Sequence, residues 1–347
     1  MFFLDKDIVE IIECVRPSLR KLENKNVVVT GSSGFLGKYF IKVMSEYNLE
    51  TQNKINIIGV DNYVTSHNKI KNNIFYGKNI EIINGDATLI KHLNYKFDYI
   101  IHAAGIASPE NYQKFPLETI DVSTNVLREL LEIAKRDKCR MLFFSSSEMY
   151  GDPTADNIPT KESYRGNVSC HGSRAPYDES KRLGETICWV YQTYFDVFVS
   201  IVRPFNVYGP GMMPNDYRVF PNFAKNLLAG ESLKVYGNGE QTRTFCYITD
   251  AIIGFFKVLV DSAKPDVFNI GNPNPEIKLT DLANLIISLI KPDASLEIVN
   301  YPKSYPDNEP NRRCPDISKY ETLFSFNPKI SLEEGILRFY EWAKLHY

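Results

Sequence analysis

A tyrosine and a lysine stand four positions apart, at Tyr177 and Lys181. On a helix this spacing places both side chains on one face. The lysine ammonium would favour the phenolate and so lower the pKa of the tyrosine toward neutrality. A tyrosinate can take the proton of an alcohol while a hydride leaves the same carbon for a nicotinamide, and the hydroxyl of Ser146 could hold the reacting oxygen. The pair predicts alcohol oxidation, although the same spacing also occurs often by chance on helix surfaces.

A glycine-rich turn earlier in the chain predicts where the cofactor binds. Residues 27–29 are three valines, typical of a buried strand, and residues 38–44 continue as a helix. Backbone N–H groups at the start of such a helix face the phosphates of a dinucleotide. A glycine turn by itself is also compatible with a tight turn that binds nothing. The predicted contacts in this turn are Gly31, Gly34, Phe35, Leu36 and Gly37.

Asp61 follows the next predicted strand, residues 54–60, and stands 24 positions after Gly37. A carboxylate there can accept hydrogen bonds from both ribose hydroxyls of an adenosine and would repel a 2′-phosphate. NAD is therefore expected rather than NADP, with Asn62 as a further contact. The alternative interpretation is an aspartate that only caps the turn after the strand.

Two more strand ends offer cofactor contacts. Asp86 and Ala87 follow the third predicted strand, where the carboxylate could bind an adenine amino group or could equally cap a helix. Ala103 and Ala104 follow the fourth, and their small side chains would let a flat cofactor ring lie against the backbone, but they also suit ordinary close packing. His102, just before them, is expected to be structural.

Strand and helix patterns alternate along the first two thirds of the chain, which predicts a parallel sheet covered on both faces. The predicted strands after the first are residues 54–60, 79–83, 97–102, 140–145 and 198–203, and a long helix is predicted over about 116–137. The expected fold is α/β: a Rossmann-type doubly wound parallel sheet with a smaller C-terminal α/β substrate-binding domain.

This pattern predicts three regions. Residues 1–25 form an N-terminal helical extension, and residues 26–205 form the NAD-binding domain. Residues 206–347 are mainly the substrate domain, rich in Pro, Asn, Gly and Tyr, although a strand at 266–270 is expected to return to the main sheet.

Composition excludes several classes of function. A formal net charge of −2 and the lack of a basic block argue against a nucleic-acid partner. The apolar runs are too short to cross a bilayer. The six cysteines are scattered without a Cys-x-x-Cys pair, so no metal is expected and a cytoplasmic location is the simpler interpretation.

Together, the glycine turn, Asp61, the serines at 145–147 and the Tyr-x-x-x-Lys pair resemble the extended short-chain dehydrogenase/reductase superfamily, in its NAD-dependent epimerase/dehydratase family. Residues 203–210 and 235–243 look like that family's nucleotide-diphosphate-sugar segments. The resemblance implies a UDP-sugar substrate and a homodimer built as a four-helix bundle, in which one helix carries Tyr177. The residues suggested for its apolar contact are Ile187, Cys188, Val190 and Tyr191.

Three reactions of that family begin with oxidation of the sugar C4 hydroxyl. A 4,6-dehydratase usually carries an Asp-Glu pair where this chain has Ser147 and Glu148, so dehydration is less favoured. Residues 145–153, 172–182 and 312–317 are similar to segments of UDP-glucuronate decarboxylases. Decarboxylation of a UDP-uronic acid is the leading hypothesis, and a 4,6-dehydratase or 4-epimerase is the alternative. A non-catalytic sensor of NAD or nucleotide sugar is a remote one, since both members of the Tyr/Lys pair are present.

The resemblance also implies residue roles. Tyr177 would be the base, Lys181 its electrostatic support, Ser146 the hydroxyl that holds O4, Glu148 the acid/base near C5, and Arg313 the residue that closes the site around the carboxylate. The implied substrate contacts are Ser108, Tyr112, Asn206, Arg218, Tyr236, Gln241, Arg243, Tyr247 and Arg313.

Arg243 is the best candidate for the diphosphate, because a guanidinium can bind two phosphate oxygens at once. Two positions depart from the decarboxylase pattern. Ser146 replaces the usual threonine and keeps the hydroxyl, whereas Gly211 replaces the usual arginine, so one polar contact near the nucleotide is expected to be missing.

Overall fold

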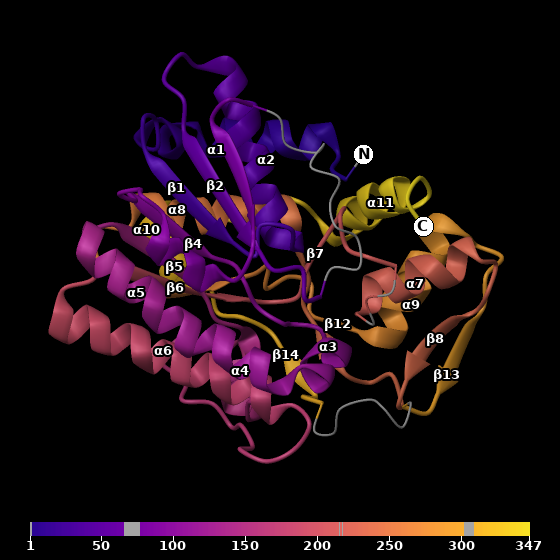
Figure 1. Cartoon of the computed structure of the whole chain (residues 1–347). Coiled ribbons are helices and arrows are strands. Elements are labelled where there is room, and N and C mark those ends of the chain that lie inside the picture. Colours follow the sequence, from indigo (N-terminus) through magenta and orange to yellow (C-terminus); the bar gives the residue numbers. More distant parts are fainter. Residues whose placement is uncertain (1, 66–76, 215, 217, 302–308) are drawn as a thin grey trace.

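The computed structural model describes residues 2–65, 77–214, 216, 218–301 and 309–347. Its centre is a seven-stranded sheet in the order β11-β6-β5-β4-β1-β2-β3, and every pair of neighbours is parallel (Figure 1). The strands are β1 (Asn26–Thr30), β2 (Asn56–Asp61), β3 (Ile80–Asn84), β4 (Tyr99–His102), β5 (Arg140–Phe144), β6 (Val199–Pro204) and β11 (Val267–Ile270). The strand order reverses direction between β1 and β4, and ligands of such sheets bind at this point, beyond the carboxyl ends of the strands.

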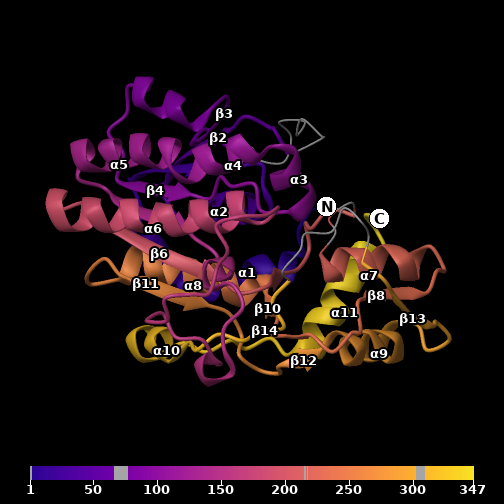
Figure 2. The same ribbon diagram turned by 90° about the horizontal axis from the view of Figure 1, so that it is seen from below.

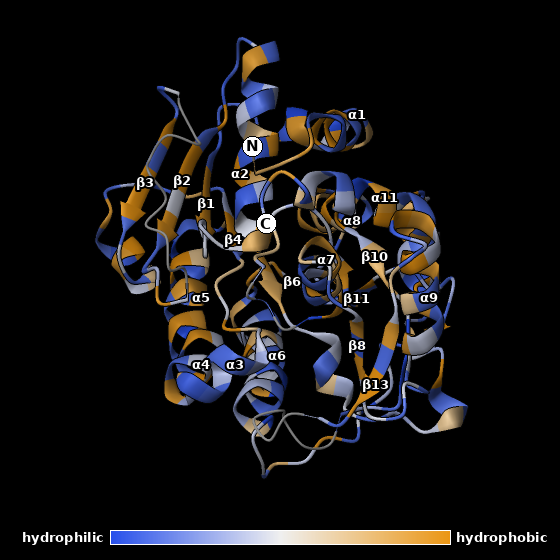
Figure 3. Cartoon of the chain, turned by 90° about the vertical axis from the view of Figure 1, so that its right-hand side faces the viewer, coloured by the Kyte–Doolittle hydropathy of each residue, from blue (hydrophilic) through white to orange (hydrophobic). Residues whose placement is uncertain are grey.

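Both faces of the sheet are buried at its central strands, which are nearly continuous runs of apolar residues (Figure 3). Val27 and Val29 point into a core shared with α1 (Asp5–Lys21), α2 (Phe35–Glu50) and α8 (Ile248–Asp261). Val28 points into a second core on the opposite face, shared with α5 (Asn125–Asp137) and α6 (Ala175–Phe195). Figure 2 shows these two helical layers on either side of the strands. The doubly wound α/β fold is confirmed.

The predicted helix over 116–137 is wrong as a single element. The structure has α4 (Pro116–Ser123) and then α5, separated at Thr124 with φ −128° and ψ −74°. The Thr124 hydroxyl donates to the carbonyl of Ile120 at 2.8 Å. Such bonds from a threonine side chain to the preceding turn often bend a helix, and the apolar periodicity continues across the break, so the pattern alone did not reveal it.

The helix predicted within residues 1–25 is α1, and it is part of the main body. It packs against α2 and α8, and its buried Asp7 accepts a hydrogen bond from Arg338 of α11 (Leu332–Ala343) at 2.7 Å. β11 returns to the sheet as predicted, and α8 also packs on it. The predicted boundary at residue 206 therefore does not separate the two parts in space, because β11 and α8 follow it in the sequence but belong to the main sheet and its helical layer.

Most of the remaining elements gather on the side of the molecule that carries α7, α9 and β8 in Figure 1, whereas α10 packs on β11. Short sheets join β8 to β13, β7 to β10, and β9 to β12 and β14. The helices are α3 (Pro109–Lys114), α7 (Val219–Leu228), α9 (Leu279–Ile290) and α10 (Ser318–Phe324), and the short strands are β7 (Val207–Tyr208), β8 (Leu233–Tyr236), β9 (Thr242–Arg243), β10 (Cys246–Tyr247), β12 (Ile277–Lys278), β13 (Leu296–Val299) and β14 (Arg312–Arg313). Within the described ranges, none of the helices has the length and apolar character that crossing a bilayer requires.

Candidate active site

A cavity of about 470 Å³ lies beyond the carboxyl ends of the central strands, between the sheet and the C-terminal elements. It brings together residues from distant parts of the chain. The predicted site residues that line it are Tyr112, Glu148, Tyr177, Asn206, Arg218, Tyr236, Gln241, Arg243 and Arg313. Arg174, Tyr301 and Glu309 also line it, and the sequence analysis assigned no role to them.

Tyr177 and Lys181 lie on the same face of α6, as predicted, and both are buried. The Lys181 ammonium lies 5.7 Å from the centroid of the Tyr177 ring and donates to the carbonyl of Phe144 at 2.8 Å. Tyr112 stacks on the Tyr177 ring at 5.6 Å with an interplanar angle of 17°. Ser146 does not line the cavity, but its hydroxyl forms a hydrogen bond with the Tyr177 hydroxyl.

The expected lowering of the Tyr177 pKa by Lys181 is wrong for this structure. Burial raises the pKa of Tyr177 to about 12, and the bond to Ser146 opposes this only in part. Burial likewise lowers the pKa of Lys181 to about 8. Both shifts share a cause, since a low-dielectric surrounding disfavours the charged form of either group.

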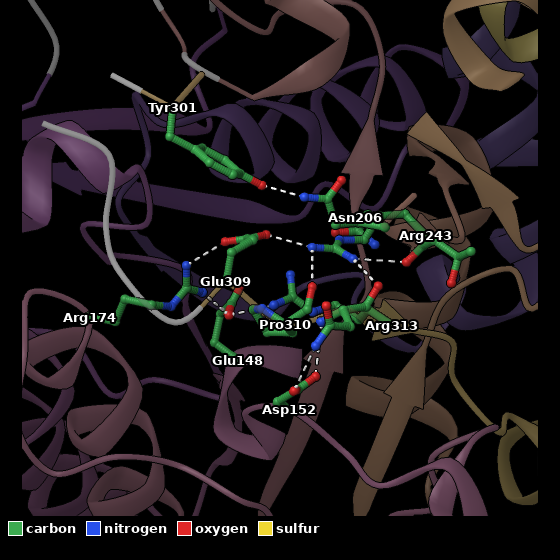
Figure 4. Close-up of polar contacts among 12 residues, drawn as sticks. Glu148, Asp152, Arg174, Asn206, Arg243, Tyr301, Glu309, Pro310 and Arg313 are labelled. Atoms are coloured by element: carbon green, nitrogen blue, oxygen red, sulfur yellow. Dashed lines mark hydrogen bonds and ion pairs between the residues drawn. The ribbon is translucent and has the colours of Figure 1, made fainter. Parts of the chain in front are cut away.

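Glu148 is held by two guanidinium groups (Figure 4). Its Oε2 accepts from Arg313 Nη2 at 2.7 Å and also from Arg174 Nη2. Burial alone would raise the pKa of Glu148, but the charges of Arg313 and Arg174 lower it to about 2. Glu148 is therefore a carboxylate at neutral pH, and neighbouring Asp178 has its pKa raised to about 7 by burial and by the Glu148 charge.

A second carboxylate, Glu309, bridges two arginines across the cavity (Figure 4). It accepts from Arg174 Nη1 at 2.7 Å and from Arg243 Nη2 at 2.6 Å. Arg243 also donates to the carbonyl of Pro310 at 2.7 Å. The arginine predicted to bind a diphosphate is thus oriented into the cavity and already bound to an anionic group.

Arg174 precedes α6 by one residue and stands three positions before Tyr177, which is one helical turn. That spacing was the available signal for Arg174. The sequence held no comparable signal for Glu309, because its partners, Arg174 and Arg243, are 135 and 66 positions away.

The glycine turn joins β1 to α2, and Phe35 and Leu36 are the first two residues of that helix. Gly31 has φ +68°, and a Cβ on it would lie 2.6 Å from the backbone of Ala104. Only glycine allows this close approach to the loop after β4, where Ala103 and Ala104 lie. The Asp61 carboxylate, at the end of β2, accepts from Ser33 N at 2.9 Å and from Tyr63 N at 2.8 Å.

Comparison with known proteins agrees with this arrangement. Residues 27–271 match the family described as "NAD dependent epimerase/dehydratase family". The chain belongs to this family.

Curated members of this family are similar to the chain in sequence over most of their length. The chain is 35% identical to UDP-glucuronic acid decarboxylase 1 of Xenopus tropicalis, over 96% of this chain and 79% of the relative. It is 38% identical to UDP-glucuronic acid decarboxylase 6 of Arabidopsis thaliana, over 90% of this chain and 87% of the relative.

Solved structures of the family share the fold. UDP-N-acetylglucosamine 4-epimerase from Methanobrevibacter ruminantium M1 is 26% identical with a TM-score of 0.77, covering 92% of this chain and 98% of that one. UDP-glucuronic acid 4-epimerase from Bacillus cereus, in complex with UDP-glucuronic acid and NAD, is 25% identical with a TM-score of 0.75, covering 93% and 100%.

As a member of this family the chain uses NAD, and the residues around the glycine turn fit that cofactor. The turn leaves Gly34 exposed at the start of α2, and the Asp61 oxygens keep lone pairs beyond those that bind Ser33 and Tyr63. When bound, NAD accepts a hydride and later returns it.

The other predicted cofactor contacts also have structural roles. Asp86 caps the short helix that starts at Ala87, since it accepts from Thr88 N at 2.9 Å. Asn62 accepts from Val64 N at 3.3 Å. His102 is structural, as expected: its ring nitrogens are bonded to the Thr30 hydroxyl and the Val122 carbonyl.

Two predicted substrate contacts do not reach the cavity. Tyr247 lies in the core, because its ring packs edge-on against Tyr208 at 5.5 Å and its hydroxyl donates to Asp7 at 2.7 Å. Ser108 precedes α3 and accepts from Asn111 Nδ2 at 2.8 Å. Among the residues that do line the cavity, Asn206 donates to the Thr244 carbonyl.

Metal-binding clusters of His, Cys, Asp or Glu do not occur in the part of the chain that the structure describes. All six cysteines are free thiols. The ionisable groups that line the cavity include Arg174, Arg243, Arg313, Glu148 and Tyr177.

Proposed function

We propose that the chain is an NAD-dependent UDP-glucuronate decarboxylase that forms UDP-xylose. The sugar C4 alcohol is oxidised, the C6 carboxylate leaves as CO₂, and the hydride returns to C4, so NAD is not consumed. The observation that carries the proposal is Glu148 bound by Arg174 and Arg313 beside Tyr177 in one cavity. The decarboxylases from Xenopus and Arabidopsis support it.

In the first step Tyr177 takes the proton of the C4 hydroxyl, and Ser146 orients that oxygen through the bond that it shares with Tyr177. The raised pKa of Tyr177 means that the phenol must give up its proton against the cost of burial. The charge of Arg218 opposes that cost, and Lys181 lies 5.7 Å from the Tyr177 ring on the same face of α6.

In the second step the new C4 ketone makes the C6 carboxylate a β-keto acid, whose electrons pass to the ketone as CO₂ leaves. Arg174 and Arg313 supply positive charge where that carboxylate would lie. Both arginines are bound to Glu148 in this structure, so the substrate carboxylate would compete with Glu148 for them. Released from the arginines, Glu148 would have its pKa raised by burial and could serve C5 as acid/base.

The test is incubation of the NAD-loaded protein with UDP-glucuronate, followed by mass spectrometry of the sugar nucleotide. Loss of one CO₂ supports the proposal. An isomer of unchanged mass would identify a 4-epimerase, the activity named for the Bacillus cereus structure, and loss of water would identify a 4,6-dehydratase. Either product, or no turnover at all, would contradict decarboxylation.

We propose further that the protein is a homodimer in which α6 packs against its copy. The predicted contact needs correction, because Cys188 and Tyr191 face the core. The exposed apolar residues of α6 include Leu183, Trp189 and Tyr194, at 51%, 52% and 68%. A cytoplasmic location is also proposed, supported by six free cysteines.

A further inference from the structure

The ammonium of Lys38 lies beside the glycine turn and forms no ion pair with the part of the chain that the structure describes. Lys38 directly follows Gly37, in the first turn of α2, and its backbone N–H donates to Gly34. Its Nζ lies 4.1 Å from the centroid of the Phe2 ring. Among the described residues, this ammonium has neither an ion pair within 4.0 Å nor a side-chain hydrogen bond. A half-buried cation without an ion pair is costly, and an anion that binds beside it lowers this cost.

Asp61 attracts Lys38 but does not pair with it. The Asp61 oxygens accept the backbone N–H groups of Ser33 and Tyr63. Burial lowers the pKa of Lys38 to about 8, and the charge of Asp61 reverses only part of this. Lys38 is thus still mostly protonated at neutral pH, in a place where water screens its charge poorly.

Phe2 is fixed over this lysine by a chain of aromatic contacts. Its ring meets Phe3 edge-on at 4.7 Å, and Phe3 meets Tyr39 edge-on at 4.8 Å. The Tyr39 hydroxyl donates to the carbonyl of Pro210 at 3.0 Å. The segment before α1 is thereby attached to the first turn of α2 and to the loop after β7.

The Phe2 ring also lies against Gly211, where similar decarboxylases usually carry arginine. A Cβ at Gly211 would lie 2.3 Å from Phe2 Cε1, so no larger side chain fits there while Phe2 keeps its place. Phe2 therefore contacts both Gly211 and the ammonium of Lys38.

We propose that Lys38 binds the diphosphate of NAD and that Phe2 holds its ammonium in place. The diphosphate of a dinucleotide lies at the start of the helix after the glycine turn, which is where Lys38 stands. The bound anion supplies the counter-ion that Lys38 lacks. This role is a contact with the cofactor and does not depend on which sugar the enzyme converts.

The experiment is calorimetric titration of the cofactor-free protein with NADH, ADP and adenosine, comparing wild type with Lys38→Met. We expect Lys38→Met to weaken the binding of NADH and ADP roughly tenfold to a hundredfold, because a charge-assisted hydrogen bond is lost. Adenosine lacks phosphate, so its affinity should not change. Lys38→Arg should restore most of the ADP affinity. The matched control is Lys42→Met, one turn further along α2, where Lys42 is paired with Glu46.

An unchanged NADH affinity in Lys38→Met would overturn the proposal, and so would an equal loss for adenosine, which would mean that Lys38 only supports the fold of the turn. Phe2→Ala tests the second half: we expect a smaller loss for ADP with adenosine unaffected, and no loss would refute the role of Phe2. Because these measurements report binding, failure of the decarboxylase assay would leave their outcome unaffected.

Discussion

At the scale of single residues, the proposed first chemical step depends on the protonation state of the Tyr177 hydroxyl. Its burial and its bond to Ser146 act on the phenol in opposite directions. The proposed base is thus held in its neutral form at neutral pH. This arrangement leads to a direct test.

Tyr177→Phe should lower kcat by roughly 10³-fold, because it removes the group that accepts the C4 proton. The affinity for NADH should stay within about twofold, since the glycine turn and Asp61 are untouched. Stopped assays with UDP-glucuronate and titration with NADH measure the two effects. Turnover at the wild-type rate would disprove the assignment of Tyr177 as base.

Lys181 makes stability depend on pH. Its pKa is about 8 in the folded protein and about 10.5 in an unfolded chain, so the unfolded chain binds more protons between these values. The free energy of unfolding therefore rises with pH between these two values. The contribution of neutral Lys181 to stability is fully present above about pH 10.5 and is lost as the pH falls through about 8, where the buried lysine must carry a charge.

Lys181→Met should remove this dependence. The Tm of the variant relative to wild type should be highest at about pH 7 and should fall as the pH rises to about 10. Thermal unfolding at several pH values measures it, with the exposed Lys91→Met as control. A Tm difference that stays constant with pH would contradict the assignment.

At the scale of elements, the cavity is closed by side chains from strands and loops that meet only in the folded chain. Arg174 precedes α6, Arg243 lies on β9, and Glu309 precedes β14. The Glu309 carboxylate occupies the position between Arg174 and Arg243 where an anionic group of a ligand could bind. A negatively charged substrate must compete with it.

Glu309→Gln should therefore lower the KM for UDP-glucuronate by about threefold to tenfold, the size expected for one competing charged contact. Steady-state kinetics measure it. The control is Glu276→Gln, since Glu276 pairs with Arg312 and does not line the cavity. An increase in KM for Glu309→Gln would show that Glu309 helps to bind the substrate instead.

The contact between α1 and α11 is a second test at this scale. Asp7 is fully buried, and Arg338 donates to it at 2.7 Å. Arg338→Met should cost about 3–5 kcal/mol, because Asp7 is left without its cation. Asp7→Leu combined with Arg338→Met should recover part of this loss in urea unfolding.

Arg16→Met is the control for this pair, since Arg16 joins Glu50 at the surface and should matter by less than about 1 kcal/mol. If Arg338→Met were as mild as Arg16→Met, α1 would be attached by its apolar face alone.

At the scale of the whole molecule, the proposed dimer buries the exposed apolar face of α6. Leu183→Glu with Trp189→Glu places two charges in that face, and light scattering should then show a monomer where the wild type is a dimer. Leu345→Glu, at another exposed leucine, should leave the mass unchanged. A wild-type monomer, or a dimer that survives both charges, would refute this interface.

Local pattern was enough for the strands, for the glycine turn and for the Tyr177–Lys181 spacing, because these depend on residues close together in the sequence. Local pattern did not predict the break at Thr124. The hydrogen bond from the Thr124 side chain to the Ile120 carbonyl does not change the spacing of apolar residues. Tyr247 shows the same limit: a tyrosine in a binding motif and a tyrosine in a core have the same local sequence.

The order of residue types along this chain determined by itself the α/β layering, the NAD-type turn and the placement of Tyr177 and Lys181 on one helix face, since backbone geometry and periodicity act over a few residues. Only the tertiary structure decided the charges of the site. The pKa values of Tyr177 and Glu148, the bridge made by Glu309 and the unpaired state of Lys38 follow from burial and from partners far away in the sequence. Electrostatic energy depends on distance and on exclusion of water, and both are set when the chain folds.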